Sequence, residues 1–138
     1  MKVKQENKII IQEGEMGNIQ SSLDYFLKFN IPKDARILDI GCNFGSLVFN
    51  LYKLGYKNIF GIEIDENAIN RGRLFYSEIA NNLVIHKPGN IPFGSNAFDV
   101  IMMFDVIEHV PDIKFFINNE VCRVLKKGGC FIFQTPNK

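Results

Sequence analysis

The sequence lacks the features that mark several classes of protein. Its cysteines, Cys42, Cys122 and Cys130, do not follow the spacing of a zinc site, so we expect no bound metal. Lysine and arginine (16) outnumber aspartate and glutamate (15) by one, which indicates no basic surface for nucleic acid. No apolar run approaches the roughly 20 residues that cross a bilayer, so we expect no contact with a membrane. We also find no internal repeat, low-complexity segment or linker.

What remains is the composition of one ordinary globular domain. Hydrophobic residues make up 46% of the 138 residues and charged residues 22%, which is typical of a soluble protein. An odd number of cysteines without a signal peptide favours reduced thiols and a cytoplasmic location. We therefore expect a single domain over residues 1–138, with an N-terminal arm and helix over 1–35 and a core over 36–138.

Residues 36–45, which read RILDIGCNFG, carry the most informative local pattern. A short apolar run bounded by charge is typical of a strand buried on both faces of a parallel sheet. The run breaks into a loop with glycines at Gly41 and Gly45, and helical spacing of apolar residues follows. Glycines let the backbone approach a ligand closely, and the first N–H groups of a helix favour an anion or a hydroxyl. The segment therefore predicts a ligand cradle.

The rest of the chain alternates between helix and strand patterns. Periodicity and turn residues predict helices over about 16–29, 47–54, 65–79 and 111–127, and strands over about 36–40, 58–64, 82–86, 98–104 and 130–134. Residues 8–14 are either a short strand or an arm. Such alternation predicts an α/β fold: a doubly wound, mostly parallel sheet of about five strands with helices on both faces.

Asp65 is the expected N-cap of the third helix, and Gly55 and Gly128 with Gly129 are expected to end the second and fourth helices. The third helix would turn four residues inward, with Gly72 packed tightly against the sheet: Ala68, Gly72, Phe75 and Ile79.

Ligands in such a sheet bind at the carboxyl ends of the strands, beside the point where the strand order reverses. Glu63 ends the second strand 24 residues after Asp39, and an acid there can accept hydrogen bonds from both hydroxyls of a ribose. The candidate residues at the four strand ends are Asp39, Gly41, Cys42, Asn43 and Gly45, then Glu63, then residues 87–91, then Phe104, Asp105, Glu108 and His109.

Several of these segments resemble one family. Residues 37–45 (ILDIGCNFG) and 61–63 (GIE) are similar to the first two motifs of class I S-adenosylmethionine-dependent methyltransferases. Residues 90–110 and 124–137 are similar to the later motifs, so the resemblance covers about 37–137. Within the family, the closest similarity is to small-molecule O-methyltransferases of the ubiquinone-biosynthesis type. The resemblance implies a Rossmann-like enzyme that uses S-adenosyl-L-methionine to methylate a small-molecule acceptor.

The resemblance also implies how the cofactor is held. Backbone groups of the glycine loop would hold its methionine end, Glu63 would hold the ribose, and Ile64 would lie against the adenine. The full set of implied cofactor-binding residues is Asp39, Gly41, Cys42, Gly45, Glu63, Ile64, Gly89, Asn90, Ile91, Phe104 and Asp105.

Two residues keep alternative roles at this stage. Asp39 either binds the cofactor or ties down the glycine loop by accepting backbone hydrogen bonds, and the two roles are compatible. His109 is the best candidate for a general base, because its ordinary pKa lies near working pH, but a histidine just before a helix also serves as a structural or capping residue.

The sequence departs from the family pattern in three places. Asn43 stands where many members have a glycine, and Lys87 lies near where many have an acid that reads the adenine amino group. Members usually continue past the fifth strand with another helix and two strands, whereas this sequence stops at Lys138. We therefore expect either a truncated form of a longer protein or a homo-oligomer that covers the edge formed by residues 130–134.

Two other functions remain open as alternatives. One is a non-catalytic S-adenosylmethionine-binding module or remnant, which the missing C-terminal segment suggests. The other is an NAD-dependent oxidoreductase, which the loop disfavours: residues 41–46 read GCNFGS and lack the second and third glycines of the dinucleotide pattern G-x-G-x-x-G.

Overall fold

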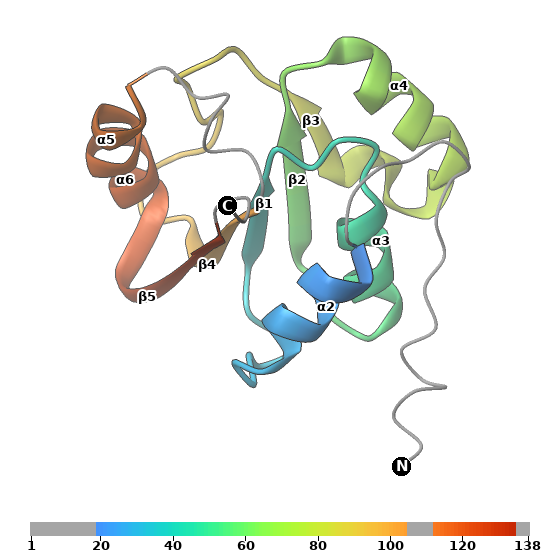
Figure 1. Ribbon diagram of the computed structural model, residues 1–138, viewed down its shortest axis with the longest axis horizontal. Coiled ribbons are helices and arrows are strands. Elements are labelled where there is room, and N and C mark those ends of the chain that lie inside the picture. Colours follow the sequence, from blue (N-terminus) through green and yellow to red (C-terminus); the bar gives the residue numbers. More distant parts are fainter. Residues whose placement is uncertain (1–18, 105–111, 135–138) are drawn as a thin grey trace.

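A computed structural model describes residues 19–104 and 112–134 of the protein and contains one five-stranded sheet (Figure 1). All four strand pairs are parallel, in the order β3-β2-β1-β4-β5. The strands are β1 (Ile37–Ile40), β2 (Ile59–Glu63), β3 (Leu83–Ile85), β4 (Phe98–Phe104) and β5 (Leu125–Gln134). The predicted α/β class and parallel sheet are confirmed, and the strand order reverses between β1 and β4.

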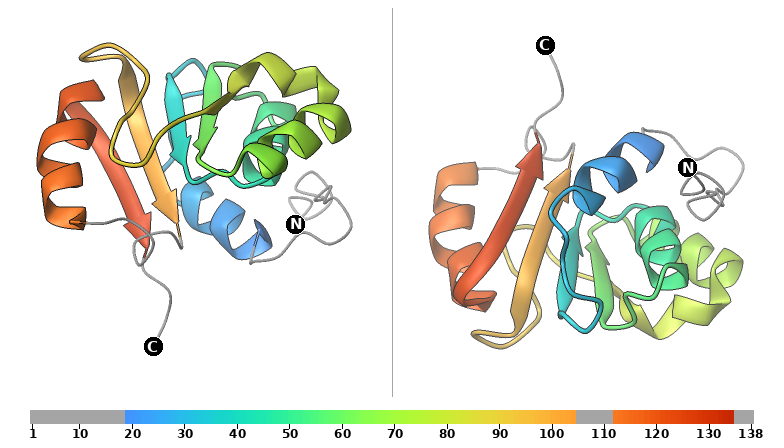
Figure 2. Two further views of the ribbon diagram at one scale, coloured as in Figure 1. Left: turned by 90° about the horizontal axis from the view of Figure 1, so that it is seen from above. Right: turned by 90° about the horizontal axis from the view of Figure 1, so that it is seen from below.

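Helices cover both faces of this sheet, as predicted. In both views of Figure 2 the helix over residues 113–124 lies on one side, and α3 (Ser46–Lys53) and α4 (Glu66–Phe75) lie on the other. The second side is formed by α2 (Ile19–Leu27), α3, α4 and the 3₁₀-helix η1 (Ser77–Asn82). The first side is formed by α5 (Ile113–Phe115), the π-helical segment η3 (Phe116–Val121) and α6 (Cys122–Val124), which follow one another without a break.

Alternating side chains of the central strand β1 pack into two separate hydrophobic cores, one on each face of the sheet. Ile37 packs with the α2 and α3 side, whereas Leu38 and Ile40 pack with Phe116 and Val124 on the other side. All four residues of β1 are buried, which is the reason that its sequence is a nearly continuous apolar run. Asp39 is the one charged residue in that run, and it is buried too.

The predicted helix over 111–127 is too long at its C-terminal end. The helix ends at Val124, and Leu125 has extended backbone angles (φ −85°, ψ 134°) because it already pairs with Phe98 of β4. The pairing shifts between Phe98 and Val100, so residues 126–129 form a bulge inside β5. The glycines in that bulge therefore shape a strand irregularity and not a helix cap.

The predicted helix over 65–79 is also interrupted. Asp65 caps it as expected, because its side chain accepts hydrogen bonds from the N–H groups of Asn67 and Ala68. The helix ends at Phe75, and the backbone breaks at Tyr76 (φ −110°, ψ 60°) before η1 begins. This break leaves Phe75 half-exposed, so its predicted inward orientation is wrong.

Gly72 of α4 lies directly against the loop that follows β1. A Cβ atom at this position would overlap the carbonyl oxygen of Phe44 and lie 2.8 Å from its carbonyl carbon. We expected this glycine to pack against the sheet, but the atoms nearest to it belong to the loop backbone at Phe44. The close approach compensates for the cost of about 1 kcal/mol that a glycine carries inside a helix.

Some predicted features lie outside the described residues. These are the strand or arm at 8–14, the start of the first helix at 16–18, the segment 105–111 with Asp105, Glu108 and His109, and residues 135–137.

We predict that Gly72→Ala destabilises the protein by about 1 to 3 kcal/mol, because the added methyl group forces α4 away from Phe44. The gain in helix propensity, about 1 kcal/mol, only partly offsets this cost. Urea unfolding measures the difference. Gly94→Ala is the control, because a Cβ atom at Gly94 meets nothing within 4 Å; equal stability of the two variants would contradict the packing account.

Candidate functional site

The loop after β1 is held in an unusual backbone conformation. Gly41 (φ 78°), Asn43 (φ 56°) and Gly45 (φ 96°) all have left-handed backbone angles. The N–H groups of Gly41 and Cys42 both donate to the carbonyl oxygen of Ile62, at 2.8 and 2.9 Å. Asparagine tolerates such angles better than other residues with a side chain, so the loop accommodates Asn43 where the family pattern has glycine.

Glu63 connects this loop to the end of β2. One carboxylate oxygen accepts the N–H of Asn43 at 2.8 Å, and the other accepts the N–H of Asp65 at 3.1 Å. A carboxylate has about four acceptor positions, so two remain for a ligand after these bonds form. Glu63 can therefore fix the loop and bind a diol together. Sequence analysis missed the bond to Asn43, which no local pattern encodes.

Asp39 lies in the sheet next to Glu63 and carries a buried carboxyl group. It is 4% exposed, and its strand neighbours are Gly61 of β2 and Met102 of β4. No residue in the described part of the chain donates a hydrogen bond to its side chain. Burial, and to a smaller extent the charge of Glu63, raises the pKa of Asp39 from 3.8 to about 8. A cation bound beside this group would favour its ionised form.

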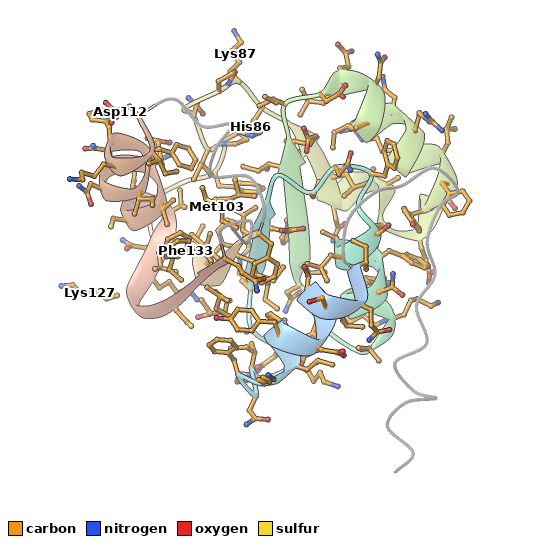
Figure 3. The ribbon with its side chains drawn as sticks, in the orientation of Figure 1. His86, Lys87, Met103, Asp112, Lys127 and Phe133 are labelled. Carbon is orange, nitrogen blue, oxygen red and sulfur yellow. The ribbon has the colours of Figure 1, made fainter. Side chains whose placement is uncertain are left out.

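The loop after β3 forms a closed turn over residues 86–91. The N–H of Asn90 donates to the carbonyl oxygen of Lys87 at 3.1 Å, and the ring Nδ1 of His86 lies 2.8 Å from the carbonyl oxygen of Asn90. Gly89 has a φ of 79° and open space beside it. Figure 3 shows the Lys87 side chain extending away from the protein. Ile91 is buried in the core, so only the turn before it faces outward.

The end of β4 adds an aromatic wall. Phe104 is nearly buried, and the ring of Tyr25 from α2 packs edge-on against it at 5.9 Å between centroids. Figure 2 shows α2 beside the tip of β4 in both views. Sequence analysis did not find Tyr25, because helical periodicity does not show where a helix crosses the sheet. Ile64, the next residue after Glu63, is exposed.

The topology therefore brings several predicted site residues together at the carboxyl ends of the strands. Asp39, the glycine loop and Glu63 come from adjacent strands, with the turn after β3 and the end of β4 on either side. Asp105 and His109 lie outside the described residues. Within residues 19–104 and 112–134, no group of three or more His, Cys, Asp or Glu side chains could hold a metal ion, and no helix is long and apolar enough to cross a membrane.

Comparison with known proteins places the chain in a family. The family model of the methyltransferase domain matches residues 38–133. An uncharacterized protein of Methanocaldococcus jannaschii is 35% identical over 111 residues, which are 80% of this chain and 45% of that protein. A ubiquinone biosynthesis O-methyltransferase of Colwellia psychrerythraea is 34% identical over 116 residues, which are 76% of this chain and 43% of that enzyme.

Solved structures agree with this assignment. The crystal structure of a Pyrococcus horikoshii protein superposes with a TM-score of 0.73 and 28% identity, and the match covers 85% of this chain and 53% of that one. The chain thus spans about half the length of the relatives it matches. The matched motifs, the strand order and the glycine loop give one conclusion: this chain belongs to the class I S-adenosylmethionine-dependent methyltransferases.

Proposed function

We propose that the chain binds S-adenosylmethionine at the carboxyl ends of β1 and β2 and serves as the cofactor site of a small-molecule methyltransferase. The observation that carries the proposal is the buried carboxyl group of Asp39, which lies near Glu63 and accepts no hydrogen bond from any residue in 19–104 or 112–134. Burying a carboxyl group without a partner is costly, and a cationic ligand repays that cost. S-adenosylmethionine carries an ammonium and a sulfonium at one end and a ribose diol in its middle.

Residues at the carboxyl ends of neighbouring strands offer a suitable partner for each part of this ligand. Asp39 and the backbone of the glycine loop would hold the methionine end, and the free acceptor positions of Glu63 would take the ribose hydroxyls. Exposed Ile64 offers an apolar surface for the adenine, and Gly89 with Asn90 offers backbone groups at its edge. Phe104 would form the wall near the sulfonium.

The chemistry needs alignment more than it needs reactive side chains. A nucleophilic atom of the acceptor forms a bond to the methyl carbon while the carbon–sulfur bond breaks, and sulfur keeps the electron pair as a neutral thioether. Because the leaving group already carries a positive charge, the protein mainly holds the two reactants in line and excludes water. For a hydroxyl acceptor a base must take the proton, and we retain His109 as the candidate for that role.

A binding module without turnover is the second candidate function. The share of the relatives that this chain matches favours this second candidate. The chain spans about half the length of those relatives, so part of their acceptor site can lie outside the segment that the chain matches. Binding of S-adenosylmethionine by calorimetry, together with a methyl-transfer screen over phenolic and other small acceptors, separates the two. Binding with turnover supports the enzyme, and binding without turnover for any acceptor supports the module.

We predict that Glu63→Ala weakens binding of S-adenosylhomocysteine by about 1.5 to 3 kcal/mol, because two charge-assisted hydrogen bonds to the ribose are lost. Calorimetry with the 2′-deoxy analogue isolates the ribose contribution: the analogue binds the wild type more weakly than the parent ligand, and the difference shrinks in the variant. Asp65→Asn is the control, since asparagine also caps helices. Unchanged affinity in Glu63→Ala would refute the ribose role.

We predict that Asp39→Asn stabilises the free protein, by up to about 4 kcal/mol at pH 7. The folded state keeps the Asp39 proton up to about pH 8, whereas the unfolded chain releases it near pH 3.8. The free energy of unfolding of the wild type therefore falls as pH rises from 4 to 8, because the unfolded chain releases the Asp39 proton and the folded state does not. The asparagine variant has no such proton and lacks this decrease. Denaturant unfolding across this range should show a gap between the two proteins that grows with pH.

The same variant should bind the cofactor at least tenfold more weakly, since the counter-charge for its cationic end is gone. A variant that is more stable but binds poorly identifies Asp39 as a residue kept for function. A variant that is less stable at every pH would show instead that Asp39 is a structural residue.

We also infer that the outer edge of β5 is covered in solution by a second copy of the chain. Among the described residues, no strand pairs with β5 on the side away from β4. Phe131 and Phe133 of this edge strand lie on one face of the sheet with their rings stacked at 5.4 Å between centroids, and Phe133 is exposed. An apolar edge strand favours pairing with another chain. We predict a dimer in sedimentation velocity, and a monomer at micromolar concentration would contradict this inference.

A further inference from the structure

Two side chains of the helix over residues 113–124 form hydrogen bonds with the backbone of the loop that follows β3. Glu120 of η3 accepts the N–H of Ile91 through Oε1 at 2.9 Å. Arg123 of α6 donates to the carbonyl oxygen of Ile91 through Nη2 at 2.9 Å and to that of Phe93 through Nη1 at 2.8 Å. Three backbone groups of one loop are therefore bound by two side chains that lie about 30 residues later in the sequence.

The two side chains also bind each other. Arg123 Nη2 lies 2.9 Å from Glu120 Oε1, and Arg123 Nε lies 3.4 Å from Oε2. The hydrogen bond from Arg123, with that from Ile91, holds the pKa of Glu120 below its usual value, so Glu120 is a carboxylate at neutral pH. Both side chains are partly buried, which limits screening by water. We call Glu120 and Arg123 the loop clamp.

The loop clamp fixes one end of the turn over residues 86–91, and β2 fixes the other. The N–H of His86 donates to the carbonyl oxygen of Glu63 at 3.1 Å, so the turn begins beside the proposed ribose residue. It ends at Ile91, whose backbone N–H and C=O are both held by the clamp. Between these anchors lie Gly89 and Asn90, which have no strand or helix of their own to hold them.

We propose that Glu120 and Arg123 are positioning residues for the adenine end of the cofactor, acting through the turn they hold. This inference rests on the proposed function, which assigns Gly89 and Asn90 to the adenine. The loop crosses from the β2–β3 side of the sheet to the helix over residues 113–124, so the clamp links the adenine side of the site to the opposite helix (Figure 1).

A matched control exists at the other end of the strands. Asp99 accepts the backbone N–H of Arg36 at 2.8 Å and pairs with Lys126 at 3.2 Å. This cluster joins a carboxylate, a backbone N–H and a cation as the loop clamp does, but it lies at the amino ends of β1 and β4, away from the proposed site. Its loss should affect stability without affecting the ligand.

The test compares two ligands in four proteins: wild type, Arg123→Met, Glu120→Gln and Asp99→Ala. The ligands are S-adenosylhomocysteine and 5′-methylthioadenosine, which keeps the adenine and ribose but lacks the amino acid end. We expect Arg123→Met to raise the Kd of both ligands by the same factor, about tenfold. Glu120→Gln keeps an acceptor for Ile91 and should stay within about threefold, and Asp99→Ala should bind both ligands as the wild type does.

Each other outcome overturns a distinct claim. If wild type binds neither ligand, the proposed function fails. If wild type binds but Arg123→Met binds equally well, or loses affinity only for S-adenosylhomocysteine, the positioning role fails while the proposed function stands. If Arg123→Met does not fold, Arg123→Lys takes its place, because lysine keeps the charge but cannot reach two carbonyl groups in the planar geometry of arginine. A Kd unchanged in Arg123→Lys then overturns the positioning role.

Discussion

The attachment of the glycine loop to β2 is the constraint on which the rest of the site depends. One carbonyl group, that of Ile62, accepts hydrogen bonds from both Gly41 and Cys42, and the Glu63 carboxylate accepts a third from Asn43. On the side of α4, Gly72 lets the helix approach the loop so closely that no side chain fits between them. These contacts fix the loop before any ligand arrives, which lowers the entropic cost of binding.

In the proposed site, the buried acid of β1 is a compromise between stability and function. Asp39 lies in the central strand between Gly61 and Met102, and no described residue donates a hydrogen bond to its side chain. A protein selected only for stability would place an apolar residue there. In the proposed function, the strong interaction of a carboxylate with a cation in a site of low polarity offsets this cost when the cofactor binds. Glu63, which is less buried and already bonded to two N–H groups, carries a smaller cost.

Features with a local cause were predictable from the sequence. The apolar run Phe98–Phe104 is a strand with the predicted bounds, Asp65 caps α4, and Gly55 takes the left-handed angle of a helix end (φ 112°). Features that depend on distant contacts were not predictable. The early end of the last helix follows from pairing between Leu125 and Phe98, and the break at Tyr76 follows packing that brings its hydroxyl group to 2.8 Å from that of Ser46.

The same distinction holds for the site. Sequence spacing placed Asp39 and Glu63 at adjacent strand ends, because a parallel sheet brings those ends together. It did not show the bond between Glu63 and Asn43, the ring of Tyr25 against Phe104, or the loop clamp, since each joins segments 20 or more residues apart.

The most direct measurement of the central claim is a titration of the ¹⁵N-labelled protein with S-adenosylhomocysteine, followed by amide chemical shifts. We predict that the largest shifts fall in three separate segments, at residues 39–45, 63–65 and 87–91, and that they saturate together with one Kd. Shifts that stay absent at millimolar ligand, or that fall at the amino ends of the strands near Arg36 and Asp99, would contradict this prediction.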